Sequence, residues 1–160
     1  MSVLISFISI AVLTAVDQVI KFVVERYLQP IGSVEFINGF IGWNYVRNTG
    51  AAFGSFSQST TLLSIVTGIV ILAGIVLIAT KKIKSKFYLT CAVMVISGGL
   101  GNLIDRVLKG YVVDFIEVQF TDFAVFNFAD ILVTVGAIAI MIYVIVDMFR
   151  EHKKTGEKHE

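Results

Sequence analysis

The sequence has very few of the residues on which disulfide scaffolds and histidine-based sites depend. Its 160 residues include one cysteine, Cys91, and one proline, Pro30. A single cysteine excludes an intrachain disulfide, and a single proline leaves the apolar runs free of proline breaks. Both histidines, His152 and His159, lie in the charged C-terminal tail. This excludes a His-Glu-x-x-His zinc site and a Ser-His or Cys-His pair in the apolar body, and we expect neither a metal nor a cofactor.

Charge is also scarce. Charged residues make up 16% of the chain and hydrophobic residues 56%, the formal net charge is +1, and the mean hydropathy is +0.85. A soluble domain of this composition would lack enough polar surface to cover itself. We therefore expect one integral membrane domain over residues 1–160, and the near-neutral charge gives no basis for nucleic-acid binding.

Four stretches are long and apolar enough to cross a membrane, which takes roughly 20 helical residues. They are residues 2–24, 60–80, 87–104 and 130–149. The first has no basic segment before it and no small-x-small cleavage site after it, so we expect it to be retained. The third contains Gly98, Gly99 and Gly101, and small residues permit close helix packing.

The connections between these spans carry charges of different sign. The connection between the second and third spans contains four lysines and no acidic residue, whereas residues 105–129 carry more acidic than basic residues. Because cytoplasmic connections are enriched in lysine and arginine, we expect the lysine connection and both termini in the cytoplasm. The longer loops, residues 25–59 and 105–129, then face outward.

These outward loops have strand character. Residues 31–46 alternate imperfectly between apolar and polar types, with turn candidates at Gly32, Asn38, Gly39 and Gly42. Residues 111–120 are rich in β-branched and aromatic types. The predicted fold class is an all-α membrane protein, a bundle of four transmembrane helices with a small extracytoplasmic β-sheet element.

Ionisable residues also lie in or beside the spans, where burial is costly unless the charge is paired. Asp17 and Lys21 are four residues apart and share one helical face, which fits either a self-neutralising pair or a functional one. Asp105 and Arg106 close the third span after Asn102. In one interpretation they mark the water boundary and pair with each other. In the other, Arg106 binds a lipid phosphate or a substrate carbonyl.

Two further aspartates matter most for chemistry. Asp114 has apolar neighbours, and Asp130 opens the fourth span, where its simplest role is a helix N-cap. The topology brings both to the same outer boundary of the bundle. Two carboxylates a few Å apart cannot both ionise, so they would share a proton and support aspartic peptide hydrolysis without a metal. Asn48 and Asn127 lie in the same outward loops, where asparagine is often a turn former.

Five motifs in order resemble the lipoprotein signal peptidase family, also called signal peptidase II. They are D-Q-V-I-K at 17–21, N-T-G-A-A-F-G at 48–54, G-G-L-G-N-L-I-D-R at 98–106, V-V-D-F at 112–115 and F-N-F-A-D at 126–130. The resemblance spans nearly the whole chain. Its departures are small: no basic residue precedes the first span, and Ile20 stands where a smaller residue is common.

The resemblance implies a bacterial plasma-membrane (inner-membrane) endopeptidase, active on the extracytoplasmic side, that cuts just before a diacylglyceryl-modified cysteine of a prolipoprotein. Asp114 and Asp130 fall on the family's catalytic pair. Asn48, Asn102, Arg106 and Asn127 fall on positions that line its site, and Asp17 and Lys21 on a supporting polar pair. The expected partners are diacylglyceryl-prolipoproteins, membrane lipid and globomycin-type peptide inhibitors.

Three alternatives stay open at this point. A small transport protein would use Asp17, Asp114 and Asp130 as a proton relay, although we find none of the inverted repeats common in transporters. A serine-lysine peptidase would pair Lys21 with Ser55 or Ser57. A non-catalytic assembly subunit would use both aspartates as caps or interface residues.

Overall fold

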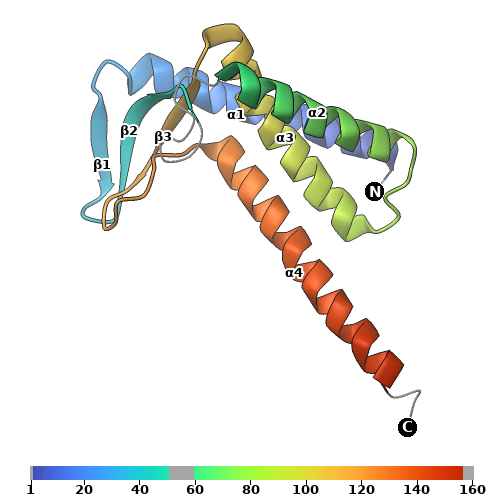
Figure 1. Cartoon of the computed structure of the whole chain (residues 1–160). Coiled ribbons are helices and arrows are strands. Elements are labelled where there is room, and N and C mark those ends of the chain that lie inside the picture. Colours follow the sequence, from blue (N-terminus) through green and yellow to red (C-terminus); the bar gives the residue numbers. More distant parts are fainter. Residues whose placement is uncertain (1, 51–59, 157–160) are drawn as a thin grey trace.

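The computed structural model describes residues 2–50 and 60–156, with side chains described as far as residue 149 (Figure 1). These residues form four helices and three strands. The elements are α1 (Val3–Tyr27), β1 (Ser33–Ile37), β2 (Ile41–Asn48), α2 (Thr60–Ala79), α3 (Lys86–Lys109), β3 (Val112–Val118) and α4 (Phe128–Gly156).

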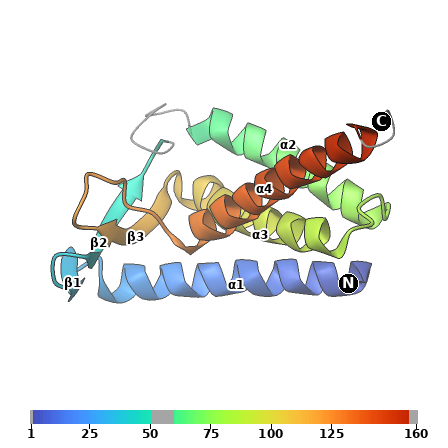
Figure 2. The ribbon, with the colours of Figure 1, turned by 90° about the horizontal axis from the view of Figure 1, so that it is seen from below.

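All four helices are long and apolar enough to span a membrane, which confirms the four predicted spans. They run alternately up and down, with the small sheet at one end of the bundle (Figures 1 and 2). The start of α1, the α2–α3 connection and the end of α4 lie at the opposite end. The lysine connection and both ends of the helical region therefore share one side, and the sheet lies on the other.

Helix α3 is the central element, because it packs against α1, α2 and α4. Two of its glycines make this possible. A Cβ at Gly98 would overlap the backbone carbonyl of Ala129, and one at Gly101 would overlap the carboxylate of Asp17. The predicted close packing at these glycines is thus confirmed. The apolar core among α1, α2 and α3 consists of Ile10, Ile71, Ile78, Leu89, Val93 and Ile96.

Helices α1 and α3 both extend beyond their predicted ends. Helix α3 ends at Gly110, whose left-handed backbone (φ +80°) suits glycine and whose N–H donates to the carbonyl of Arg106. The sequence pattern ends this span at residue 104, and one of the two interpretations makes Asp105 a marker of the water boundary. That interpretation is wrong, because Asp105 is fully buried within the helix. Polar side chains are buried here because they have partners on neighbouring helices.

The three strands form one antiparallel sheet in the order β1-β2-β3, which confirms the predicted β element. Gly39, with φ +71°, lies in the turn between β1 and β2, as predicted. Gly42 does not lie in a turn but within β2, where a Cβ would overlap the side chain of Gln119. Its lack of a side chain makes room for that neighbour, which sequence alternation does not reveal.

The register of β2 and β3 places two polar residues on one face of the sheet. Asn48 is opposite Val112, and Val46 is opposite Asp114. Asn48 is therefore the diagonal neighbour of Asp114, and diagonal neighbours on adjacent strands share a face. The sheet thus orients both side chains toward the N-terminal end of α4.

Candidate active site

The first turn of α4 carries one of the two predicted aspartates. The backbone N–H of Asp130 donates to Asn127 Oδ1 at 2.9 Å, and the backbone N–H of Asn127 donates to Asp130 Oδ2 at 3.1 Å. This reciprocal arrangement is a capping box in which Asn127 is the cap. The N-cap role, the simpler of the two roles considered for Asp130, is therefore wrong: the cap lies three residues earlier, and Asp130 is the acidic residue whose carboxylate accepts from it.

Asp114, on β3, receives an amide hydrogen bond on each carboxylate oxygen. Asn127 Nδ2 donates to Oδ1 at 2.6 Å, and Asn48 Nδ2 donates to Oδ2 at 2.8 Å. Asn48 also accepts from the backbone N–H of Gly50 at 2.9 Å, so it forms a local turn as well as a contact with Asp114. The structure thus connects both aspartates through a single residue, Asn127.

Asn102, on α3, completes this set of asparagines. Its Nδ2 donates to Asp130 Oδ1 at 2.7 Å. Its Oδ1 accepts from Lys21 Nζ at 2.8 Å and from Asn127 Nδ2 at 3.1 Å. The two carboxylates are therefore held by amides from β2, α3 and the α4 cap, three elements far apart in sequence.

Lys21 lies within a buried group of charges. Its ammonium is 3.0 Å from Asp17 Oδ2, as the spacing predicts, and 3.1 Å from Asp105 Oδ2. Lys109, four residues after Asp105, is 3.1 Å from Asp105 Oδ1 and 2.8 Å from Glu25 Oε2. Asp105 thus pairs with two lysines and not with Arg106, contrary to the predicted pairing. The 105/109 spacing is the sequence signal that could have indicated part of this.

These contacts bear on the serine-lysine alternative. With Asp17, Asp105 and Asn102 around it, the three N–H groups of Lys21 have three acceptors. These acceptors already occupy the ammonium, and none of them is a serine. The candidate serines, Ser55 and Ser57, lie outside the described residues.

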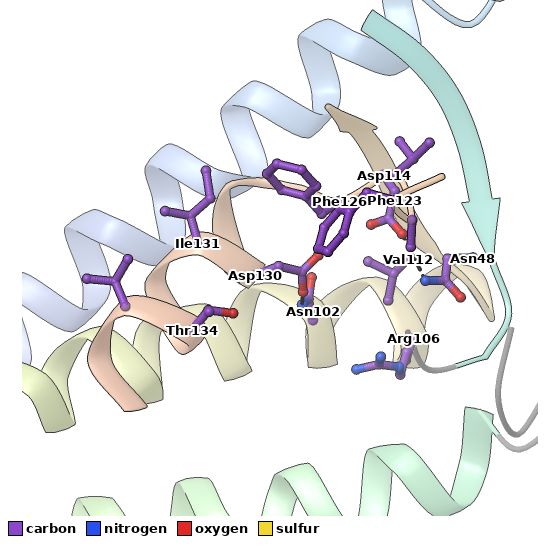
Figure 3. A pocket seen from close by; sticks show the side chains of 13 residues that line it. Asn48, Asn102, Arg106, Val112, Asp114, Phe123, Phe126, Asp130, Ile131 and Thr134 are labelled. Carbon is purple, nitrogen blue, oxygen red and sulfur yellow. Dashed lines mark hydrogen bonds between the residues drawn. The ribbon is translucent and has the colours of Figure 1, made fainter. Parts of the chain in front are cut away.

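A cavity of about 420 Å³ opens beside the two aspartates. Figure 3 shows Asp114, Asp130, Asn48, Asn102 and Arg106 around it, with an apolar wall from α4 and the segment before it. That wall, which sequence reasoning does not single out, consists of Phe123, Ala124, Val125, Phe126, Ile131, Thr134 and Val135 with Val112. A second cavity of about 240 Å³, lined mainly by apolar residues of α2, α3 and α4, also reaches Asn102, Arg106 and Asp130.

The surroundings of Asp114 raise its pKa, so the carboxyl keeps its proton to a higher pH than an exposed aspartate does. The residue is 1% exposed, and burial together with the negative charge of Asp130 raises its pKa to about 6. Hydrogen bonds from Asn48 and Asn127 and the charge of Lys21 act in the opposite direction. Burial dominates, which is the condition that keeps one member of a carboxylate pair protonated.

The fold and the site define a class: a multi-pass membrane protein with two carboxylates at one end of a helical bundle, lining a cavity that joins an apolar groove. Such a pair can hold one proton and polarise a water, which is acid–base chemistry suited to hydrolysis. This geometry alone does not distinguish the substrate.

Comparison with known proteins supplies the family. The model of the family Signal peptidase (SPase) II matches residues 9–146. A lipoprotein signal peptidase of Caldanaerobacter subterraneus subsp. tengcongensis is 42% identical over 135 residues, 83% of this chain and 90% of that protein. One of Clostridium acetobutylicum is 40% identical over 151 residues, 92% of this chain and 96% of that protein.

Solved structures agree with this result. Two chains described as bacterial membrane enzymes are each 35% identical, with TM-scores of 0.81 and 0.76. The first match covers 89% of this chain and 88% of the other, and the second 87% and 91%. The chain belongs to the signal peptidase II family and is a membrane-bound protease.

Proposed function

We propose that this protein removes the signal peptide from diacylglyceryl-modified prolipoproteins, with Asp114 and Asp130 as the catalytic aspartates. The observation that carries the proposal is their shared environment. Both line the same cavity, and Asn127 donates to each of them. The family relationship supports the substrate class and does not favour the transport or assembly alternatives.

The two carboxylates take complementary roles in the proposed reaction. Asp114, whose pKa burial and the charge of Asp130 raise to about 6, acts as the proton donor, and Asp130 in the first turn of α4 acts as the base that activates the water. The pair titrates as a unit, so these are roles within one shared protonation state. An ionised carboxylate with a neutral partner is the arrangement that aspartic proteases use.

The bond changes then balance without a covalent intermediate. Asp130 takes a proton from a water whose oxygen attacks the scissile carbonyl carbon, while Asp114 donates its proton to the carbonyl oxygen. The tetrahedral diol then collapses: Asp130 gives its proton to the amide nitrogen, the C–N bond breaks, and Asp114 recovers a proton from a diol hydroxyl. The products are a new carboxyl group on the signal peptide and a free amine on the lipid-modified cysteine.

Asn48, Asn102 and Arg106 are proposed to contact the substrate near the scissile bond. Arg106 lines both cavities. Its Nε is buried and has no hydrogen-bond partner within the described ranges 2–50 and 60–156. A guanidinium N–H in this position fits a peptide carbonyl oxygen of the bound precursor.

The apolar groove between α2 and α4 is proposed to receive the signal peptide. Val66 and Val70 of α2 and Val133 of α4 line this groove together with residues of α3, and Asp130 is also part of its lining. An apolar helix in this groove would have its end beside the aspartates, and the lipid on the adjacent cysteine would stay among membrane lipids. A globomycin-type cyclic peptide with an acyl chain would compete for the same space.

The sidedness proposed from the lysine connection places the sheet and both aspartates on the extracytoplasmic side of a bacterial plasma membrane, with both termini in the cytoplasm. Single cysteines test it in a background in which Cys91 is replaced by alanine. A membrane-impermeant maleimide should label Asp122→Cys in intact spheroplasts and Lys82→Cys only after permeabilisation. The reverse pattern would contradict the proposed orientation.

The decisive activity experiment incubates purified protein with a diacylglyceryl-modified precursor and maps the cut by mass spectrometry. Asp114→Asn and Asp130→Asn should each abolish cleavage while the circular dichroism of the detergent-solubilised protein keeps its helical content. Asp122→Asn, an exposed aspartate in the same outward loop, is the matched control and should cleave normally. Near-normal processing by either of the first two variants would remove that residue from the mechanism.

A further inference from the structure

The orientation of the Asn102 amide is fixed by a group that can only donate hydrogen bonds. A lysine ammonium has three donors and no acceptor, and Lys21 Nζ lies 2.8 Å from Asn102 Oδ1. Oδ1 must therefore face Lys21, and Nδ2 must face the opposite way, where it meets Asp130 Oδ1 at 2.7 Å. Without the ammonium, Oδ1 would keep the longer, 3.1 Å hydrogen bond from Asn127 Nδ2, which that nitrogen shares with a 2.6 Å bond to Asp114, so the amide would be held less firmly.

Lys21 itself is fully buried. It lies on α1 and is not part of the cavity lining, but it contacts the lining residue Asn102 by a hydrogen bond, and its charge acts on Asp114 at longer range. Its ammonium also contacts Asp17 at 3.0 Å and Asp105 at 3.1 Å. These two carboxylates accept from the other N–H groups of the ammonium, which has no acceptor to offer Asn102.

We infer that Lys21 is a positioning residue for the proposed reaction: through its hydrogen bond to Asn102 it makes the amide present N–H, not C=O, to the ionised Asp130. This rests on the proposed function and extends it to a residue that does not touch the substrate. An N–H directed at a carboxylate stabilises the ionised, water-activating form, whereas a carbonyl directed at it favours protonation.

Other charged groups also act on Asp130, and their contribution must be separated from that of Lys21. Arg106 of α3 lines the same cavity, and Asp114 of β3 is the paired carboxylate. Lys109 is the most useful comparison, because it contacts Asp105, as Lys21 does, although its side chain is partly exposed. The recorded hydrogen bonds and ion pairs of Lys109 go to Glu25 and Asp105, and none goes to Asn102.

The test compares pH profiles of kcat/KM for Lys21→Met and for the control Lys109→Met. Lys21→Met removes the shorter of the two hydrogen bonds to Asn102 Oδ1 and leaves the 3.1 Å bond from Asn127, so the amide can turn its oxygen toward Asp130 more easily. The acidic limb is the rise of kcat/KM at low pH, and we expect it to move to higher pH by about one unit or more. This shift corresponds to the loss of one charge-assisted hydrogen bond to the carboxylate. We also expect kcat to fall roughly tenfold with a smaller change in KM. Lys109→Met should keep the wild-type limb even if it unfolds at a lower temperature.

A second variant keeps the test valid if Lys21→Met does not fold. The double variant Asp17→Asn/Lys21→Met removes one carboxylate together with the ammonium, and Asp105 keeps Lys109. Asparagine at position 17 can still accept from the N–H of Ala129, which Asp17 now does at 3.1 Å. The single variant Asp17→Asn retains Lys21 and should have the wild-type acidic limb.

The outcomes separate this inference from the proposed function. The positioning role is overturned if the acidic limb of the pH profile does not shift in the folded Lys21 variants, or if it shifts equally in Lys109→Met. Either result leaves the aspartate mechanism standing if Asp130→Asn is inactive. Cleavage by Asp114→Asn or Asp130→Asn overturns the mechanism itself. A limb that moves with Lys21 and not with Lys109 supports the inference.

Discussion

Asn127 donates from its side-chain amide to the buried carboxylate of Asp114 at 2.6 Å, while its own amide oxygen caps α4. One residue thus begins a membrane helix and orients a proposed catalytic group. The two tasks use different atoms, the oxygen for the cap and the nitrogen for Asp114. They can therefore be separated by substitution.

Asn127→Ser should keep the cap and lose the contact with Asp114. Serine is a good N-cap, so the thermal midpoint should change little, whereas cleavage should fall by at least tenfold. Asn127→Ala should lose both, with a further stability cost of about 1 kcal/mol. Circular dichroism melts in detergent and precursor cleavage rates measure the two effects. Equal activity in Asn127→Ser and wild type would show that the Asp114 contact is dispensable.

The raised pKa of Asp114 predicts a pH dependence of stability. The unfolded chain loses this proton near pH 3.8, and the folded protein keeps it to about pH 6. Between these values the folded state binds more protons, so stability falls as pH rises and the loss is complete above the folded pKa. The full effect is about 3 kcal/mol by this linkage.

Asp114→Asn should remove this dependence. Melting midpoints measured from pH 4 to pH 8 should drop between pH 4 and pH 6 for the wild type and less for the variant. Asp122→Asn, which alters an exposed aspartate, should follow the wild-type curve. Parallel curves for wild type and Asp114→Asn would contradict the assigned protonation.

Close packing at Gly101 predicts a destabilised variant. A Cβ there would overlap the carboxylate of Asp17, so Gly101→Ala should push α3 from α1, lower stability by about 1–3 kcal/mol and reduce cleavage. Gly68→Ala is the matched control on another membrane helix, because a Cβ at Gly68 meets no described heavy atom within 4 Å. A melting midpoint of Gly101→Ala as high as that of Gly68→Ala would contradict this prediction.

Narrowing the groove between α2 and α4 should affect the signal peptide specifically. Val70 lines that groove of about 240 Å³, and Val70→Trp should raise KM for a full-length precursor. A short diacylglyceryl peptide without the apolar segment should be cut at the wild-type rate. Ile69→Trp, at the neighbouring position on α2 and outside the groove lining, should cut both substrates normally. Equal losses on both substrates would indicate a different binding path.

The sequence by itself determined the membrane-spanning helices and the presence of a small sheet. The length of an apolar run and the β-branched content of a loop are local properties, so they can be read without knowing any long-range contact. The up-and-down order of the spans then required Asp114 and Asp130 to lie at the same end of the bundle. The motif order was also sufficient to indicate the family.

Only the tertiary structure decided how the polar groups pair. Lys21 and Asn102 are 81 positions apart, and nothing local indicates that one orients the other. The same holds for Asp105, which follows the predicted third span in sequence but is buried between two lysines in the structure. It also holds for the cap of α4, which is Asn127 and not Asp130. Hydrogen-bond partners depend on distances and directions of a few Å between elements, and those are set only when the helices and the sheet have packed together.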